Sequence, residues 1–368
     1  MTENFNQPKE YDVVLGGEAT APADGVVLGG LDRIKQVLAI REVKLRIDAL
    51  LDALQYGQEG LDLVIQALED KSEEVQEAAY LLLQDRKEPR VKPALQAYNP
   101  YLFFECFCTI QTHDGVSSLA ITSDRQTLVT DSYTYGGEGH SIHITKVWSL
   151  QTQQEPYTFQ AGSSYPHLQD VAITPDNQIL GITSSGDSVE LWNIKSWQKI
   201  YTSSDQWESF RYVKFSADGQ TFVTRFHKGD LNEFMLWDVR TAEDYISYIE
   251  LSKYHRYAGT LCSDSQTLVT KQDDHSTIDS WSWQTGNLIC TFKGHTGDVR
   301  CAVISSDLRL LLGGTDEHTI IVWNLRTGQK LSTLKGHLSS VNCIALSADG
   351  QTLVSSSDDG MIKMWGLP

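Results

Sequence analysis

The chain has 368 residues, of which 48 are Asp or Glu and 30 are Lys or Arg, so that its formal charge at pH 7 is −18. Such an acid excess argues against a primary nucleic-acid role, because phosphate binding depends on clustered Lys and Arg, and it favours basic partners. The sequence has no basic start followed by an apolar run and no run of about 18 apolar residues. We therefore expect a cytoplasmic protein without a signal peptide or a membrane span.

The first segment, residues 1–30, is predicted to be a polar tail followed by a glycine-rich cap. Its motif "VVLGG" occurs twice, at Val13–Gly17 and at Val26–Gly30. Glycine pairs also occur in phosphate-binding loops, but neither a following Lys-Ser/Thr pair nor a GxGxxG pattern is present. Nucleotide binding by this segment is therefore not expected.

Residues 31–100 have the hydrophobic period of amphipathic helices. The stretch "GLDRIKQVL" (Gly30–Leu38) recurs as "GLDLVIQAL" (Gly60–Leu68), and a second helical pattern follows each copy. Paired helices that repeat in this way predict a short α-solenoid. The stretch "ALEDKSEEVQEAAYLLL" resembles a HEAT repeat, which implies two HEAT-like repeats and half of a third at Arg90–Tyr98.

A longer repeat fills most of residues 101–368. The neighbouring segments "SWSWQTGNLICTFKGHTGDVRCAVISSDLRLLLGGTDEHTIIVW" and "VWNLRTGQKLSTLKGHLSSVNCIALSADGQTLVSSSDDGMIKMW" match almost residue for residue. Tryptophans recur at spacings of 44, 45, 44, 42 and 42 residues: Trp148, Trp192, Trp237, Trp281, Trp323 and Trp365. This regularity predicts one structural unit repeated six times.

The composition within each unit is that of β-strands. Stretches such as "VNCIALS", "QTLVSSS" and "GMIKMW" are rich in β-branched and apolar residues, and "SADG", "SSDL", "TPDN" and "SDRQ" have the residues of tight turns. Three strands precede or end at the tryptophan, and a fourth follows it. Four strands in a unit of this length predict one blade of a β-propeller.

These units resemble the WD40 family. The resemblance depends on the Gly-His pairs Gly294-His295 and Gly336-His337, on the tryptophans that end strands, and on the literal Trp237-Asp238. It is specific in the last two units and looser in the first four. The repeated phrase "QTLV" is similar to bacterial, especially cyanobacterial, WD40 proteins.

The resemblance implies a buried tetrad of His, Ser or Thr, Asp and Trp in a blade. The sixth unit has all four types, and the fifth has Glu in place of Asp. The residues are His337, Ser355 or Ser357, Asp359 and Trp365 in the sixth unit, and His295, Thr315, Glu317 and Trp323 in the fifth. A His beside a carboxylate and a hydroxyl also suggests a hydrolase triad, but the resemblance places these groups between strands as structural contacts.

The stretch "FECFCTIQTH" (Phe104–His113) reads as the end of a unit that has no beginning. Its "CTIQTH" aligns with "CTFKGH" and "STLKGH", whereas the chain stops at "KMWGLP", directly after a third strand. We therefore predict that residues 104–112 form the outer strand of the last blade. This pairing would close a six-bladed ring and remove an exposed edge.

No residues indicate catalysis, a metal or a cofactor. HExxH, GxSxG, Walker and calcium-loop motifs are absent, and His140 with His143 has no third ligand nearby in the sequence. The six cysteines, among them the CxC pair Cys106 and Cys108, are predicted to be buried free thiols rather than metal ligands. We expect a protein that is not an enzyme.

The predicted function is a non-catalytic scaffold or adaptor that binds other proteins or peptides, of basic character, on one face of the propeller. By the WD40 resemblance this face should include Tyr133, Tyr135, Trp207, Asp298, Asp316, Ser340 and Asp358. Two alternatives remain: an assembly or cofactor-delivery factor, by analogy with HEAT-like bilin lyases, and a regulatory peptide-binding module.

Overall fold

The computed structural model describes residues 30–112, 115–135, 141–151, 154–161, 170–184, 188–203, 210–216, 219–228, 231–241, 244–245, 257–261, 267–271, 278–282, 285, 287–295 and 297–368. The chain divides into two compact units, Met1–Pro100 and Tyr101–Pro368, which are described in turn. Apart from Gly30, the two "VVLGG" copies lie outside the described residues.

Within residues 30–100, the described part of the first unit, there are five short helices: α1 (Leu31–Leu38), α2 (Val43–Ala53), α3 (Gly57–Gln66), α4 (Glu73–Leu83) and α5 (Val91–Tyr98). Two 3-10 turns, Leu54–Tyr56 and Ala67–Glu69, extend α2 and α3. Their apolar stripes face one another, so that Leu50, Val64, Val75 and Leu83 are fully buried. Helix α2 packs against α1, α3 and α4, and α4 packs against α5.

Two sequence features of this unit have direct structural causes. A Cβ at Gly60 would lie 1.7 Å from the Ala53 carbonyl oxygen, so only glycine permits α2 and α3 to approach so closely. In the acidic turn before α4, Asp70 accepts bonds of 2.5 and 2.6 Å from Arg46 Nη1 and a 2.8 Å bond from the Ser72 backbone N–H. The carboxylate thus joins α2 to the start of α4.

The helices lie where the helical period predicts them, but a HEAT-like solenoid is not shown. Two helix pairs and one further helix, α5, are present in the described residues. A solenoid buries a continuous core by stacking about three or more repeats. The described helices amount to fewer than three full repeats, and the structure shows N-terminal helices that precede a β-propeller.

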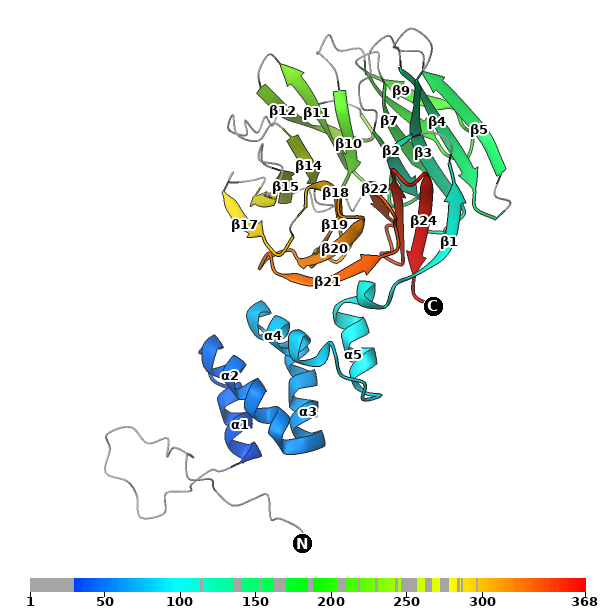
Figure 1. Ribbon diagram of the computed structural model, residues 1–368. Helices are drawn as coiled ribbons and strands as arrows, with labels where there is room; N and C mark the ends of the chain where they lie inside the picture. The colour runs from blue at the N-terminus through cyan, green and yellow to red at the C-terminus, as the bar shows by residue number, and fades with distance from the viewer. Residues whose placement is uncertain are drawn as a thin grey trace, which may run out of the picture. The chain divides into compact units, whose positions relative to one another are not determined.

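A 3-10 turn, Pro100–Phe103, spans the boundary between the two units, and the strands described in the second unit form six four-stranded antiparallel sheets (Figure 1). The strands are β1 (Glu105–Gln111), β2 (Gly115–Ile121), β3 (Thr127–Tyr135), β4 (Ser141–Ser149), β5 (Gln154–Ala161), β6 (Val171–Ile173), β7 (Ile179–Ser184), β8 (Ser188–Asn193), β9 (Lys199–Thr202), β10 (Phe210–Phe215), β11 (Thr221–Lys228), β12 (Leu231–Asp238), β13 (Asp244–Tyr245), β14 (Tyr257–Leu261), β15 (Thr267–Lys271), β16 (Ile278–Ser282), β17 (Leu288–Phe292), β18 (Val299–Ile304), β19 (Leu310–Thr315), β20 (Thr319–Asn324), β21 (Lys330–Lys335), β22 (Val341–Leu346), β23 (Thr352–Ser357) and β24 (Met361–Gly366).

The turn after the innermost strand has the same construction in four sheets. A Ser or Thr hydroxyl donates to the Asp two residues later, at 2.5 to 2.6 Å: Thr122 to Asp124, Thr174 to Asp176, Ser305 to Asp307 and Ser347 to Asp349. The next residue takes a positive φ, as at Gly350 (φ 69) and Asn177 (φ 59), which Gly and Asn adopt most readily. These turns explain the recurrence of "SADG" and "TPDN".

The strand from the start of the second unit completes its last sheet. Strand β1 pairs antiparallel with β24 in the order β1-β24-β23-β22, and Cys106 lies opposite Trp365 (Figure 1). Beyond the strand, the Thr112 backbone N–H donates a 2.8 Å bond to the Gly360 carbonyl. The outer edge of β24 is therefore covered by a segment from the other end of the unit.

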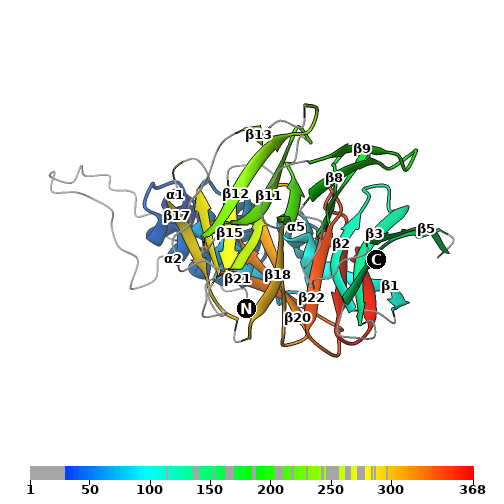
Figure 2. The same ribbon diagram turned by 90° about the horizontal axis from the view of Figure 1, so that it is seen from above.

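The innermost strands contact one another from sheet to sheet. Strand β2 contacts β6 and β22, β6 contacts β10, and β18 contacts β14 and β22. Figure 2 shows β18, β22 and β2 side by side from above. These are five of the six contacts that a closed ring of six sheets requires. A sixth contact, between β10 and β14, is not established, and both segments that flank β14, 246–256 and 262–266, lie outside the described residues. The closed six-bladed ring is therefore not established.

The core of this unit lies within and between the sheets. The ring of Trp237 stacks on Phe222 at 5.7 Å with an interplanar angle of 5°, and Trp323 is fully buried against Phe292. Of the described cysteines, all of which are free, Cys106 is exposed and the others are partly exposed. The expectation of buried thiols is thus wrong for Cys106, because it lies on an outermost strand.

Candidate functional site

Four of the predicted docking residues lie together at one end of the last two sheets. Asp298 and Ser340 directly precede β18 and β22, and Asp316 and Asp358 directly follow β19 and β23. The backbone N–H of Asp316 donates to Asp298 O at 2.9 Å, and that of Asp358 donates to Ser340 O at 3.0 Å. Ser340 Oγ contacts Asp316 O at 3.5 Å and so joins the two sheets. We call this group, with Leu338, Arg300 and Asn342, the acidic end.

Two polar side chains that the sequence reasoning missed connect to this group. Arg300 Nη1 lies 2.9 Å from Asn342 Oδ1 and 3.5 Å from Asp358 Oδ2, and Asn342 Nδ2 donates to Asp358 Oδ1. The side chains of Arg300 and Asp358 are 44% and 48% exposed. An exposed ion pair contributes about 0–1 kcal/mol, so an incoming cation can replace Arg300 at Asp358 at little cost.

The acidic end also presents an exposed apolar side chain. Leu338 is 83% exposed, the highest value among the described large apolar residues. Its backbone is fixed, because its N–H donates a 2.9 Å bond to Asp359 Oδ2. The sequence could have indicated this exposed residue by its position directly after the Gly-His pair, because that pair orders the loop in which Leu338 lies.

In the last sheet the four predicted tetrad residues form a continuous hydrogen-bonded chain. Trp365 Nε1 donates to Ser355 Oγ at 2.8 Å, Ser355 Oγ lies 2.7 Å from His337 Nε2, and His337 Nδ1 lies 2.9 Å from Asp359 Oδ2. Of the two serines considered, Ser355 is the member. The His337 side chain is only 1% exposed, so no substrate can reach it, and this geometry argues against a hydrolase triad.

The pKa shifts indicate which groups of this chain are charged, and the hydrogen-bond partners indicate where its protons lie. Burial lowers the pKa of His337, although the hydrogen bond to Asp359 acts in the opposite direction. Burial alone would raise the pKa of Asp359, but hydrogen bonds from the Leu338 N–H, His337 and the Met361 N–H hold it below its usual value. The imidazole is therefore neutral, with Nδ1–H donating to an ionised Asp359 and Nε2 accepting from Ser355.

The corresponding residues of the preceding sheet do not form such a chain, which corrects the expectation for His295, Thr315, Glu317 and Trp323. Trp323 Nε1 donates instead to Lys293 O at 2.7 Å, Thr315 Oγ1 contacts Thr319, and His295 Nδ1 contacts Gly297 O at 3.1 Å. His295 packs edge-on against Trp323. Glu317 is exposed, and its side chain passes beside Gly297 rather than reaching His295 as the shorter Asp359 reaches His337.

A simpler Trp–hydroxyl bond recurs in two other sheets. Trp148 Nε1 donates to Thr130 Oγ1 at 3.0 Å, and Trp237 Nε1 donates to Thr224 Oγ1 at 2.7 Å. The sequence reasoning missed these pairs because both sheets lack the Gly-His signal. A Thr in the "QTLVT" and "QTFVT" strands was the signal that could have identified them.

For the other three predicted docking residues, the structure does not show a position at the acidic end. Trp207 lies outside the described residues, as does His140 of the HxxH motif. Tyr133 and Tyr135 lie on β3, opposite His143 and Ser141 of β4. Their backbone positions follow from this register, and they remain predicted contacts only.

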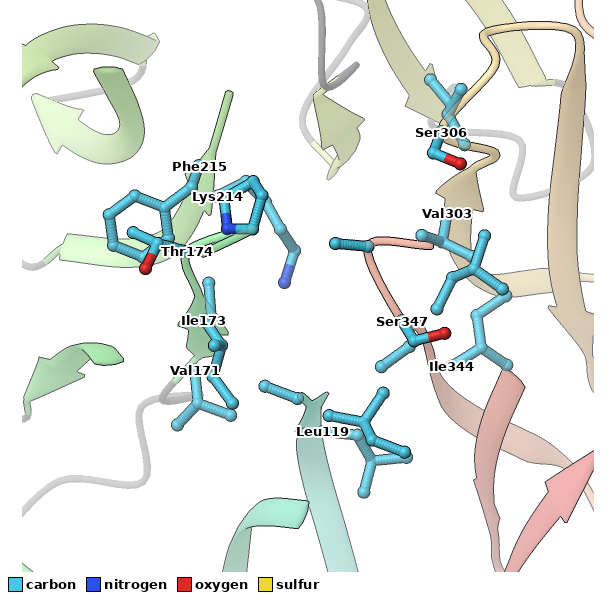
Figure 3. A pocket seen from close by; sticks show the side chains of 18 of the residues that line it. Leu119, Val171, Ile173, Thr174, Lys214, Phe215, Val303, Ser306, Ile344 and Ser347 are labelled. Carbon is cyan, nitrogen blue, oxygen red and sulfur yellow. The ribbon is translucent and has the colours of Figure 1, made fainter. Parts of the chain in front are cut away.

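A cavity of about 320 Å³ lies at the opposite ends of the innermost strands (Figure 3). Its walls are mainly apolar and include Leu119, Ile173, Val303 and Ile344. The acidic end is built before the first residues of β18 and β22, whereas the cavity is lined by their last residues and by the turns that follow. The two sites are therefore separate.

The described residues contain no group of three or more His, Cys, Asp or Glu side chains that could hold a metal ion. Within the same part of the chain, none of the helices is long and apolar enough to cross a bilayer.

Comparison with known proteins agrees with this fold. The family model of the WD domain, G-beta repeat (WD40) matches residues 286–324 and 328–366, which belong to the last two repeats. The chain therefore carries WD40 repeats within a β-propeller that follows N-terminal helices.

Curated relatives match over parts of their length. Periodic tryptophan protein 2 of Arabidopsis thaliana is 23% identical over 210 residues, which are 56% of this chain and 23% of that protein. Telomerase protein component 1 of Rattus norvegicus is 24% identical over 205 residues, 55% of this chain and 7% of that protein. Apoptotic protease-activating factor 1 of Danio rerio is 24% identical over 185 residues, 47% and 14% respectively. The chain thus matches less than a quarter of the length of each relative. These relatives do not confirm the predicted similarity to cyanobacterial WD40 proteins.

Proposed function

We propose that this protein is a non-catalytic interaction scaffold whose propeller binds protein segments at the acidic end. The observation that carries the proposal is Leu338, an apolar side chain 83% exposed on a hydrogen-bonded backbone. A partner can bury an ordered, exposed apolar side chain without the entropic cost of fixing a mobile loop.

The surroundings of Leu338 define the chemistry of the partner. Asp298, Asp316 and Asp358 supply carboxylates at the same end, and the only described cation among them, Arg300, holds Asp358 by a weak exposed pair. The chain as a whole has a charge of −18. A segment with one large apolar side chain beside Lys or Arg is therefore the best match.

The relatives support a scaffold role. WD40 repeats occur in proteins that are named as a component of telomerase and as a factor that activates an apoptotic protease. The first name describes a component of a larger enzyme, and the second describes a protein that acts on another protein. We also propose that the ring is closed with six blades, since β1 completes the last sheet and six sheets are present. A cofactor-delivery role has no comparable support, because residues 1–100 contain no Cys.

Selection of peptides from a random library on the immobilised full chain tests this proposal. We expect enriched peptides to combine an apolar residue with Lys or Arg, and to be lost in about 0.5 M salt, where charge attraction is screened within a few ångströms. Enrichment of acidic peptides, or no enrichment above an unrelated propeller-free protein, would contradict it.

A further inference from the structure

The cavity at the other end of the innermost strands has a lining that the proposed docking function does not use. Its described lining residues come from β2, β6, β10, β18 and β22 and from the turns that follow these strands. Its volume of about 320 Å³ falls at the lower end of the range for small-molecule sites, about 300–1,000 Å³.

One charged residue lines this cavity among the residues that the structure describes. Lys214, on β10, extends its amine into the space between the Ile173 side and the Val303 side (Figure 3). Several of the hydroxyl groups near the rim are engaged in turns: Thr174 donates to Asp176, and Ser347 donates to Asp349. Among the described residues, the cavity thus combines mainly apolar walls with one cationic side chain.

The partner of Lys214 is already stabilised by other donors. Asp170 Oδ1 accepts bonds from Ser118 Oγ at 2.5 Å and from the Val171 N–H at 3.0 Å, and Oδ2 accepts from the Val213 N–H at 3.2 Å. Lys214 Nζ contacts Oδ1 at 3.2 Å. An anion in the cavity that drew Lys214 away from Asp170 would therefore leave Asp170 with three donors, so no buried charge would be stranded.

We propose that this cavity binds an organic monoanion with an apolar body, whose carboxylate or similar group pairs with Lys214. The ammonium has three N–H donors, and its side chain is 29% exposed, so it can contact Asp170 and a ligand oxygen together. The apolar body would displace water from the Leu119, Val303 and Ile344 walls. The proposal does not depend on the acidic end, which lies at the opposite ends of the strands.

Displacement of the fluorescent probe 8-anilinonaphthalene-1-sulfonate by decanoate, by decanol and by decyltrimethylammonium tests the site on the full chain. We expect decanoate to bind one per chain and decyltrimethylammonium to bind at least tenfold more weakly. Lys214→Met keeps the apolar stem but removes a charge-assisted bond, so it should lower the affinity for decanoate about tenfold or more. The affinity for decanol should change less than about threefold. Lys330→Met, at an exposed position on β21, is the matched control and should change nothing.

A second variant tests the cavity itself. Ala302→Leu, on β18, fills part of the space and should weaken decanoate and decanol alike. Far-UV circular dichroism and the melting temperature show that each variant is folded. Equal decanoate affinity in Lys214→Met and the native chain overturns the proposal, as does binding of decyltrimethylammonium as tight as that of decanoate. If Ala302→Leu leaves both affinities unchanged while it remains folded, the probe binds elsewhere and the proposal is wrong.

Discussion

Ile110 in β1 lies directly opposite Ile362 in β24, so the first strand of the propeller is paired with its last. Both side chains belong to one apolar cluster with Val354 and Met364. The last sheet is thus a non-covalent junction between two segments far apart in the sequence, and its stability depends on contacts that form only when the unit is folded.

Substitution of Ile110 by Asp should destabilise this junction. The side chain packs on the apolar cluster, and burial of an unpaired charge there should lower the free energy of unfolding by about 2–4 kcal/mol. Thr109→Asp, one residue away on the exposed face of β1, is the matched control and should change it by less than about 0.5 kcal/mol. Urea unfolding measures both. Equal midpoints for the two variants would show that β1 does not hold the last sheet.

The adjacent residues Ser355 and Ser356 allow a test of the hydrogen-bonded chain. Both are buried, but Ser355 Oγ bonds to Trp365 and His337, whereas Ser356 Oγ has no partner in the described structure. Ser355→Ala should therefore lower the free energy of unfolding by about 1–3 kcal/mol, and Ser356→Ala should be neutral or slightly stabilising. Thermal unfolding of the two variants checks this difference. The reverse order would contradict the assigned bonds.

The lowered pKa of His337 predicts a pH dependence of stability. The folded state binds fewer protons at this site than the unfolded chain, in which the pKa is near 6.5. Stability from this group is therefore complete above about pH 6.5 and declines as the pH falls below that value toward the lowered folded pKa. Between pH 7.5 and pH 5.5, the free energy of unfolding should fall more for the native chain than for His337→Gln. Parallel losses would mean that His337 does not titrate in this way.

Asp170 joins three sheets, because it belongs to the second, accepts from Ser118 of the first and contacts Val213 and Lys214 of the third. Asp170→Asn replaces one accepting oxygen by an NH2 group, whose N–H donors would then face the N–H and O–H donors around this side chain. We expect a loss of about 2–3 kcal/mol in the free energy of unfolding. Asp176→Asn, in an exposed turn, is the control and should lose less than about 1 kcal/mol. Similar losses for both would argue against the joining role of Asp170.

The repeat pattern predicts much of this fold. Tryptophan spacing and turn residues define four strands per unit, and the "CTIQTH" alignment places residues 104–112 at the edge of β24, where β1 is found. The helical period locates α1 to α5 but not their stacking, because short amphipathic helices pack in many ways. Neither the repeat pattern nor the described residues define a contact between β10 and β14.

The positions of four candidate docking residues were predicted from the repeats, and their role in docking stays a prediction. Asp298, Asp316, Ser340 and Asp358 meet because each adjoins an equivalent strand end, a relation that repeats make visible. Leu338 and Asp170 were missed, because exposure and contacts between sheets depend on three-dimensional packing. The sheet that contains Glu317 shows the limit of the resemblance: its Trp323 and His295 bond to backbone carbonyls instead of forming the predicted chain of bonds.

The central claim is that partners bind at the acidic end, and Leu338→Ser tests it most directly. Calorimetric titration of one library-selected peptide into the native chain, Leu338→Ser and Leu288→Ser compares a residue of the acidic end with an apolar residue half-exposed on the outer strand β17. We predict an affinity at least tenfold lower for Leu338→Ser and an unchanged affinity for Leu288→Ser, as expected for loss of about 1.4 kcal/mol or more of apolar contact. Equal affinity of the native chain and Leu338→Ser would contradict the account.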